Sequence, residues 1–177
     1  PVLPEGLRRV LRPESAAPPP SPALLHPLRG LRALLVEDNP VNRQLATELM
    51  VRAGARVDLA ENGQEALELL ERRGADFDVV LMDLQMPVMD GYEATRRIVA
   101  HPEWGRLPVV AMTAHAMVEE RERCLALGMK GHIAKPIDPP AMLRELARYV
   151  PEGAAERDRK STRLYSSHGY ISYAVFC

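Results

Sequence analysis

Several side chains that could act on a phosphoryl group follow apolar segments of this 177-residue sequence. They are the acidic pair Glu37-Asp38, the carboxylate of Asp83, the hydroxyl of Thr113 and the ammonium group of Lys135. Three carboxylates crowded together repel one another, so they either raise their pKa values or require a cation. An all-oxygen set of ligands suits Mg²⁺, which keeps several of its waters. A carboxylate nucleophile, a divalent metal, an ammonium group and a hydroxyl together fit phosphoryl transfer.

These side chains meet only if each of them follows a strand of the same sheet. Residues 79–82 are apolar at consecutive positions, which is typical of a strand buried on both faces of a parallel sheet, and Asp83 follows them. Pro87 cannot continue a central strand because it has no N–H group, and Asp90 is placed to cap the next helix. A lone Asp in such a place usually caps a loop. The other strand ends favour a shared site at the carboxyl edge, where open α/β sheets bind ligands.

The rest of the chain predicts a regular alternation of strands and helices. Val41, Leu45 and Leu49 form one apolar stripe along the first expected helix. Expected strands cover residues 33–36, 56–60, 79–82, 109–112 and 131–134, and expected helices follow the caps Asn39, Asn62, Asp90 and Asp138 or cover residues 115–127. Five strand–helix units in this order predict a parallel, doubly wound sheet with helices on both faces.

Composition bounds the possible partners and the compartment. The formal net charge of −1 gives no support to nucleic-acid or membrane-surface binding. Cys124 and Cys177 lie far apart without metal-type spacing, so a reduced, cytoplasmic setting is the default expectation. No apolar stretch approaches the roughly 18 residues that span a bilayer. Because the chain begins with Pro1, we expect a fragment whose parent chain can carry a membrane anchor.

We expect three regions. Residues 1–30 are rich in proline and are interpreted as a linker or the end of a preceding domain, with a disordered extension as the alternative. Residues 31–150 form the domain, in which Trp104 is expected to be a surface anchor in a loop. Residues 151–177 are expected to be a disordered tail. Its end resembles translated vector sequence, and a small added strand at Ile171–Phe176 is the alternative.

Four motifs in this order resemble the receiver domain of two-component response regulators: LLVEDNPVNRQL, VVLMDLQMPVMDGYEATRRI, VVAMTAHAM and GHIAKPID. The resemblance covers about residues 31–150, and the motifs are most similar to receivers at the C-terminal side of hybrid sensor histidine kinases. It implies a flavodoxin-like α/β fold with five helices and a five-stranded parallel sheet in the order 2-1-3-4-5.

The resemblance also assigns roles to individual residues. It makes Asp83 the phospho-acceptor, and it makes Asp38, Asp83 and the main-chain carbonyl of Gln85 the direct ligands of Mg²⁺. Glu37 would bind the metal through water; many family members have Asp at this position. Thr113 would bond a phosphoryl oxygen. Lys135 would pair with the phosphoryl group, and its bond to Pro136 is expected to be cis.

Three further positions match places that modulate the family's signal. His132 occupies the position of the switch residue, which is usually Tyr or Phe, and a plain surface histidine is the alternative. His115 and Gln85 match positions that tune the lifetime of the phosphoryl group, and solvated loop residues are the alternative.

The expected function is that of a phospho-acceptor switch. Its donor would be a histidine kinase or a histidine phosphotransfer domain, and this fragment would accept phosphate rather than turn over a substrate. A stand-alone regulator and a pseudo-receiver that is never phosphorylated are the alternatives. A phosphatase of the haloacid dehalogenase type would need a second Asp where Gln85 stands. The sequence leaves dimerisation open.

Overall fold

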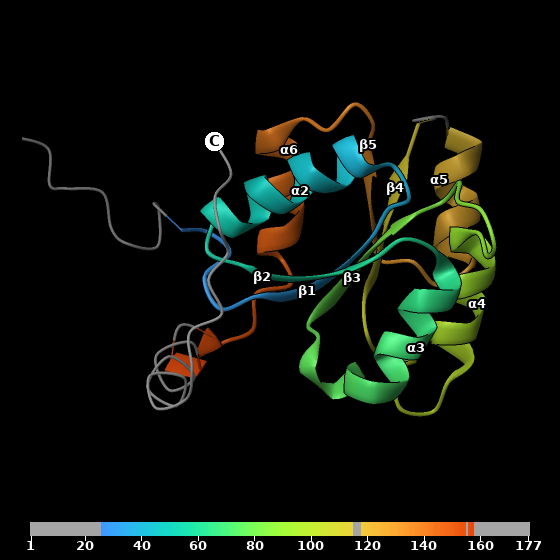
Figure 1. Ribbon diagram of the computed structural model, residues 1–177, viewed down its shortest axis with the longest axis horizontal. Helices are drawn as coiled ribbons and strands as arrows, with labels where there is room; N and C mark the ends of the chain where they lie inside the picture. The colour runs from blue at the N-terminus through green and yellow to red at the C-terminus, as the bar shows by residue number, and fades with distance from the viewer. Residues whose placement is uncertain (1–25, 115–117, 155, 158–177) are drawn as a thin grey trace, which may run out of the picture.

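The computed structural model describes residues 26–114, 118–154 and 156–157. They form one parallel sheet in the order β2-β1-β3-β4-β5, which lies between two layers of helices (Figure 1). Helices α2 and α6 pack on one face, where Met50 and Met142 are buried, and α3, α4 and α5 pack on the other, where Leu70, Ile98 and Cys124 are buried. The predicted flavodoxin-like fold and strand order are confirmed.

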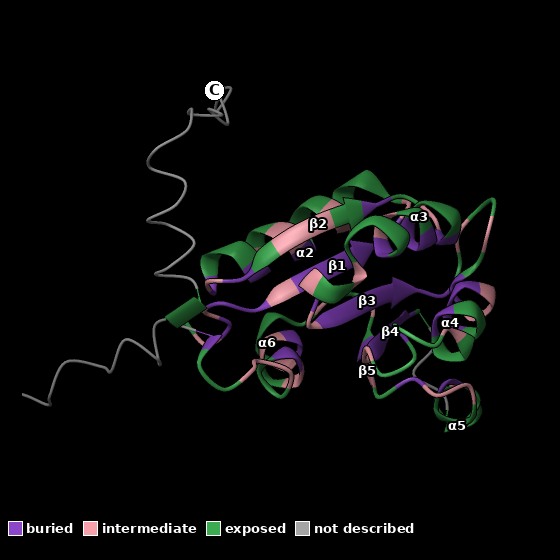
Figure 2. Ribbon diagram, turned by 90° about the horizontal axis from the view of Figure 1, so that it is seen from below, coloured by how far each residue is buried: buried purple, intermediate pink, exposed green. Residues whose placement is uncertain are grey.

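The central strands are buried on both faces, as the apolar runs predict. Every residue of β3 and β4 is buried, and Figure 2 shows β3 as buried along its whole length. β2 is an edge strand and keeps several partly or fully exposed residues. The strands are β1 (Arg32–Val36), β2 (Arg56–Ala60), β3 (Val79–Asp83), β4 (Val109–Thr113) and β5 (Gly131–Ala134).

Each predicted cap lies at the start of a helix. The side chains of Asn39, Asn62, Asp90 and Asp138 each accept a hydrogen bond from a backbone N–H in the first turn of the helix that follows. The helices are α2 (Pro40–Arg52), α3 (Gly63–Arg73), α4 (Gly91–Ala100), α5 (Val118–Ala126) and α6 (Pro139–Ala147), with the short 3-10 helix η2 (Gly74–Asp76) after α3. These caps fix where the chain turns away from the carboxyl edge of the sheet.

Two side-chain placements differ from expectation. Two residues of the predicted apolar stripe of α2 do not cover the sheet: Val41 is 72% exposed and Leu45 43% exposed, whereas Leu49 packs against the core and Ala46 and Met50 are buried. Trp104 is a core residue and not a surface anchor, because it stacks on His101 with ring centroids 3.6 Å apart and is only 7% exposed.

The packed unit reaches beyond residues 31–150 at both ends. Leu28 is fully buried, and its backbone N–H donates to the carbonyl oxygen of Ala53 at 2.9 Å. Ala154 is also buried, and a Cβ on Gly30 would lie 2.2 Å from the Ala154 carbonyl oxygen. The expectations for residues 1–25 and 158–177 lie outside the described residues. Among the described helices, none has the length and apolar character to cross a membrane.

Candidate functional site

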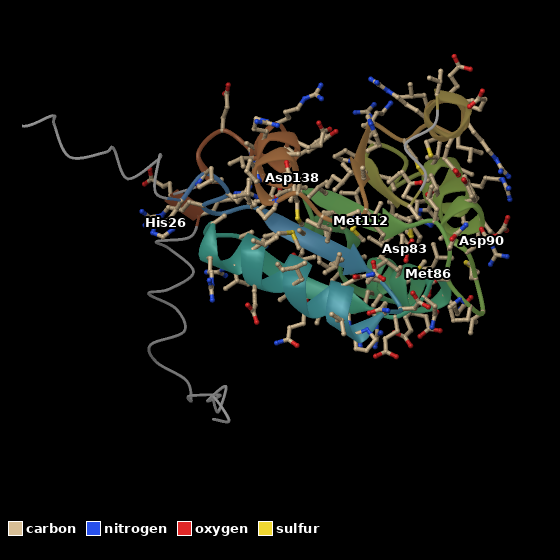
Figure 3. The ribbon with its side chains drawn as sticks, turned by 90° about the horizontal axis from the view of Figure 1, so that it is seen from above. His26, Asp83, Met86, Asp90, Met112 and Asp138 are labelled. Atoms are coloured by element: carbon tan, nitrogen blue, oxygen red, sulfur yellow. The ribbon has the colours of Figure 1, made fainter. Side chains whose placement is uncertain are left out.

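The predicted chemistry-bearing residues lie around one pocket at the carboxyl edge of the sheet, where Figure 3 labels Asp83. Parallel register brings them there: Met82 of β3 pairs with Val36 of β1, and Asp83 pairs with Met112 of β4. The carboxyl ends of β1, β3 and β4 therefore lie nearly level with one another along the strand direction. The pocket is lined by Glu37, Asp38, Asp83, Gln85, Thr113 and Lys135, among others.

The three carboxylates form a compact acidic cluster. Glu37, Asp38 and Asp83 each offer an oxygen, and these oxygens lie within 4.8 Å of one another. Glu37 and Asp83 are buried, with 1% and 5% of their surface exposed, and Asp38 is partly exposed. Such a group combines the repulsion of like charges with poor hydration, so a cation stabilises it.

Lys135 supplies one positive charge to this cluster. Its Nζ lies 2.7 Å from Asp83 Oδ2 and 2.7 Å from Glu37 Oε2. Burial lowers the pKa of Lys135, but its bonds to Asp83 and Glu37 outweigh burial and hold the pKa above its usual value. Burial raises the pKa of Glu37, and the charge of Asp83 adds to this effect against the lowering by Lys135.

The loops after β3 and β5 hold Asp83 and Lys135 in place. The backbone N–H of Gln85 donates to Asp83 Oδ1 at 3.2 Å. A Cβ on Gly91 would lie 2.1 Å from the Asp83 carbonyl oxygen, so only glycine allows α4 to start this close to the strand. The backbone N–H of Lys135 donates to the Thr113 carbonyl oxygen at 2.8 Å, and the Lys135–Pro136 bond is cis, as expected.

The residues predicted to modulate the signal are less closely tied to the pocket. Gln85 is exposed on the rim of the pocket. His132 lies in β5, is partly exposed, and is not among the residues that line the pocket. His115 lies outside the described residues.

Sequence reasoning missed three polar residues of the site. Asn42 and Arg43 in the first turn of α2 contact Glu37, and Glu120 of α5 lines the pocket and accepts a hydrogen bond from Tyr92 Oη. The one available signal was the position of Asn42 and Arg43, about one helical turn after the cap Asn39, which returns them to the end of β1.

The donor set fits Mg²⁺. All the candidate ligand atoms are oxygens, which Mg²⁺ prefers. Among the described residues, the buried Glu37 Oε2 atom has only the ammonium group of Lys135 beside it, at 2.7 Å, so this oxygen can still accept a further hydrogen bond. A water bound to a metal ion could donate to this oxygen.

Comparisons with known proteins agree with this geometry. Histidine kinase 3 of Arabidopsis thaliana is 38% identical over 152 residues, which are 74% of this chain and 14% of the kinase. The chain thus spans about one-seventh of that relative. The receiver domain of sensor histidine kinase PA1611 from Pseudomonas aeruginosa PAO1, solved with a magnesium ion coordinated in its active-site cleft, is 42% identical. It superposes with a TM-score of 0.62 over 68% of this chain and 98% of that domain.

A second solved structure contains a phosphotransfer partner. It is the receiver domain of the Saccharomyces cerevisiae response regulator Ssk1 in complex with the histidine phosphotransfer protein Ypd1, with 25% identity, a TM-score of 0.63, and 68% of this chain and 88% of that chain covered. The family model for the response regulator receiver domain matches residues 33–147, which is more than half of the chain. This protein therefore belongs to the family of response regulator receiver domains, the phosphorelay modules of two-component systems.

Proposed function

We propose that Asp83 accepts a phosphoryl group from a phosphohistidine in a Mg²⁺-dependent reaction. The observation that carries the proposal is the contact of Lys135 Nζ with Asp83 Oδ2 at 2.7 Å inside the acidic pocket. In the transfer, an Asp83 oxygen bonds to phosphorus while the P–N bond breaks, and the electron pair of that bond returns to the imidazole of the donor. The product is an acyl phosphate on Asp83.

The other residues of the pocket stabilise the transferred group. Bound Mg²⁺ would supply positive charge against the phosphoryl oxygens. Asp38, Asp83 and the carbonyl of Gln85 would hold the metal ion directly, and Glu37 would hold it through water. Lys135 would pair with a phosphoryl oxygen, and the Thr113 hydroxyl, which ends the buried strand β4, would donate a hydrogen bond to another.

These new bonds provide the switch. An acyl phosphate adds negative charge beside Thr113 and Lys135, so the state in which both contact it becomes favoured and the population shifts. His132 is proposed to respond on β5, and Gln85 and His115 are proposed to tune how long the phosphoryl group lasts.

The parent chain is proposed to be a cytoplasmic or membrane-anchored hybrid sensor histidine kinase, with this domain covering about residues 26–157. The kinase relative supports this context. The phosphoryl donor or acceptor would be the kinase's own histidine or a histidine phosphotransfer protein, and the Ssk1 complex supports the second possibility. A stand-alone regulator would carry the same site chemistry.

The test is formation of the acyl phosphate on intact protein. Incubation with acetyl phosphate and Mg²⁺ should add about 80 Da, the mass of one phosphoryl group, and EDTA should prevent the addition. Asp83→Asn should abolish it. Asp90→Asn is the matched control in the same loop, because asparagine also caps a helix, and it should still be modified. Uptake by Asp83→Asn at the wild-type rate would refute the assignment to Asp83, and the absence of uptake by the wild-type chain would favour a pseudo-receiver.

A further inference from the structure

The Arg43 side chain joins two loops at the carboxyl edge of the sheet. Its Nη1 donates to the Glu37 carbonyl oxygen at 2.8 Å and lies 3.4 Å from the Asp38 carbonyl oxygen. Its Nη2 forms an ion pair with Glu61 Oε1 at 2.9 Å, in the loop between β2 and α3. Only 17% of the Arg43 side chain is exposed. The guanidinium group therefore binds the backbone carbonyl groups of Glu37 and Asp38 and fixes the position of this backbone segment.

The same helical turn also holds the Glu37 side chain. Glu37 Oε1 accepts from the backbone N–H of Asn39 at 3.2 Å and from Asn42 Nδ2 at 3.4 Å. Its backbone N–H donates to the Ala60 carbonyl oxygen at 3.1 Å. Glu37 Oε1 is thus hydrogen-bonded at the start of α2, and Glu37 Oε2 lies beside Lys135 at the pocket.

We propose that Arg43 is a positioning residue for the metal site of this receiver. The proposal rests on the proposed function, since it concerns the same acidic cluster. Asp38 lies two residues beyond Val36, the last residue of β1, so its backbone is outside the strand ladder and needs another anchor. Groups that orient metal ligands commonly change metal affinity by 10- to 100-fold when they are removed. A planar guanidinium can bond the carbonyl groups and Glu61 together, and lysine cannot.

The positive charge of Arg43 and its positioning role predict opposite changes in Mg²⁺ affinity when the side chain is replaced. A cation near a metal site repels the metal ion, so removal of this charge alone would strengthen Mg²⁺ binding. Loss of positioning would weaken it. A weaker affinity after Arg43→Gln therefore points to geometry, because the electrostatic effect acts in the opposite direction.

The experiment measures Mg²⁺ binding to the full chain by calorimetry, with the metal alone and no phosphoryl donor. Arg43→Gln should weaken the affinity about tenfold, and Arg43→Lys, which keeps the charge but loses the fork, about threefold. Arg52→Gln removes the same charge from the far end of α2, where the side chain is 82% exposed, and should leave the affinity within about twofold of wild type. Urea unfolding in EDTA checks that each variant is folded.

Folded Arg43→Gln that binds Mg²⁺ as tightly as wild type, or more tightly, would overturn the proposal. If Arg43→Gln does not fold, Arg43→Lys decides: a threefold loss supports positioning, and wild-type affinity overturns it. Failure of the wild-type chain to bind Mg²⁺ would instead refute the metal site of the proposed function, and the positioning role with it.

Discussion

Glu37 is the most enclosed carboxylate of the site, with 1% of its surface exposed. Burial and the nearby charge of Asp83 raise its pKa from the usual value of 4.5, and the ion pair with Lys135 only partly opposes this. Above pH 4.5 there is therefore a range in which the folded chain still binds a proton at Glu37 and the unfolded chain has lost it. The residue that completes the acidic cluster thus costs stability when the metal is absent.

The sign of the pH dependence follows from this difference in bound protons. Because the folded state binds more protons in that range, the contribution of Glu37 to the free energy of unfolding falls as the pH rises from 4.5 through the raised pKa. Glu37→Gln cannot titrate, so its stability relative to wild type should grow over the same range. Urea unfolding in EDTA from pH 4.5 to about pH 7 measures this difference. A difference that stays constant with pH would contradict the raised pKa.

The loop between β3 and α4 contains a strained residue. Val88 has a φ of 69° and is 84% exposed, although β-branched residues rarely adopt the left-handed region. The loop is held on both sides, by the Gln85 bond to Asp83 and by the close approach of Gly91 to the Asp83 carbonyl oxygen. The strain therefore lies within the segment that carries a proposed metal ligand.

Val88→Asn should relieve this strain. Asparagine tolerates the left-handed region, whose cost for other residues is about 1–2 kcal/mol, so the variant should gain about 1 kcal/mol of stability. That gain corresponds to a rise in Tm of about 3 °C for a domain of this size. Val41→Asn is the control, because Val41 is 72% exposed in the regular helix α2 and the two residues have similar helix propensity. Equal Tm changes in the two variants would show that Val88 is not strained.

Local sequence patterns predicted the helices and strands but not which side of each helix faces the sheet. Buried strands and caps depend on neighbouring residues, so the strand ending at Asp83 and the cap Asn39 were found from the sequence alone. Leu45 lies on the exposed side of α2, although its four-residue spacing from neighbouring apolar residues is the same as that of a buried stripe. Spacing alone therefore does not determine which side of the helix faces the sheet. Arg43 was missed because one of its partners, Glu61, comes from another loop.

At the scale of the whole molecule, both ends of the described unit lie away from the site. Residues 26–31 precede β1, and Arg157 forms an ion pair with Asp78 at 3.3 Å, just before β3. Figure 3 shows His26 at the end of the molecule opposite to Asp83. The described residues at both ends of the unit therefore lie at the amino edge of the sheet, away from the acidic pocket.

This arrangement predicts that the segment before β1 is part of the folded unit. Leu28 is fully buried in the core between the sheet, α2 and α6. Leu28→Ala in the full chain should lower the free energy of unfolding by about 3 kcal/mol, from lost burial and the cavity left behind. Leu45→Ala, at a site 43% exposed, should change it by no more than about 0.5 kcal/mol.

Urea unfolding of both variants in EDTA measures the two costs without a contribution from bound metal. A cost below about 1 kcal/mol for Leu28→Ala would place the start of the domain at residue 31, where the sequence pattern puts it. A cost near 3 kcal/mol would mean that the chain entering the receiver is held at the amino edge. A conformational change at Asp83 would then have the sheet as a packed route to residues 26–31, because Leu28 packs in the same core as Leu35 of β1 and Leu81 of β3.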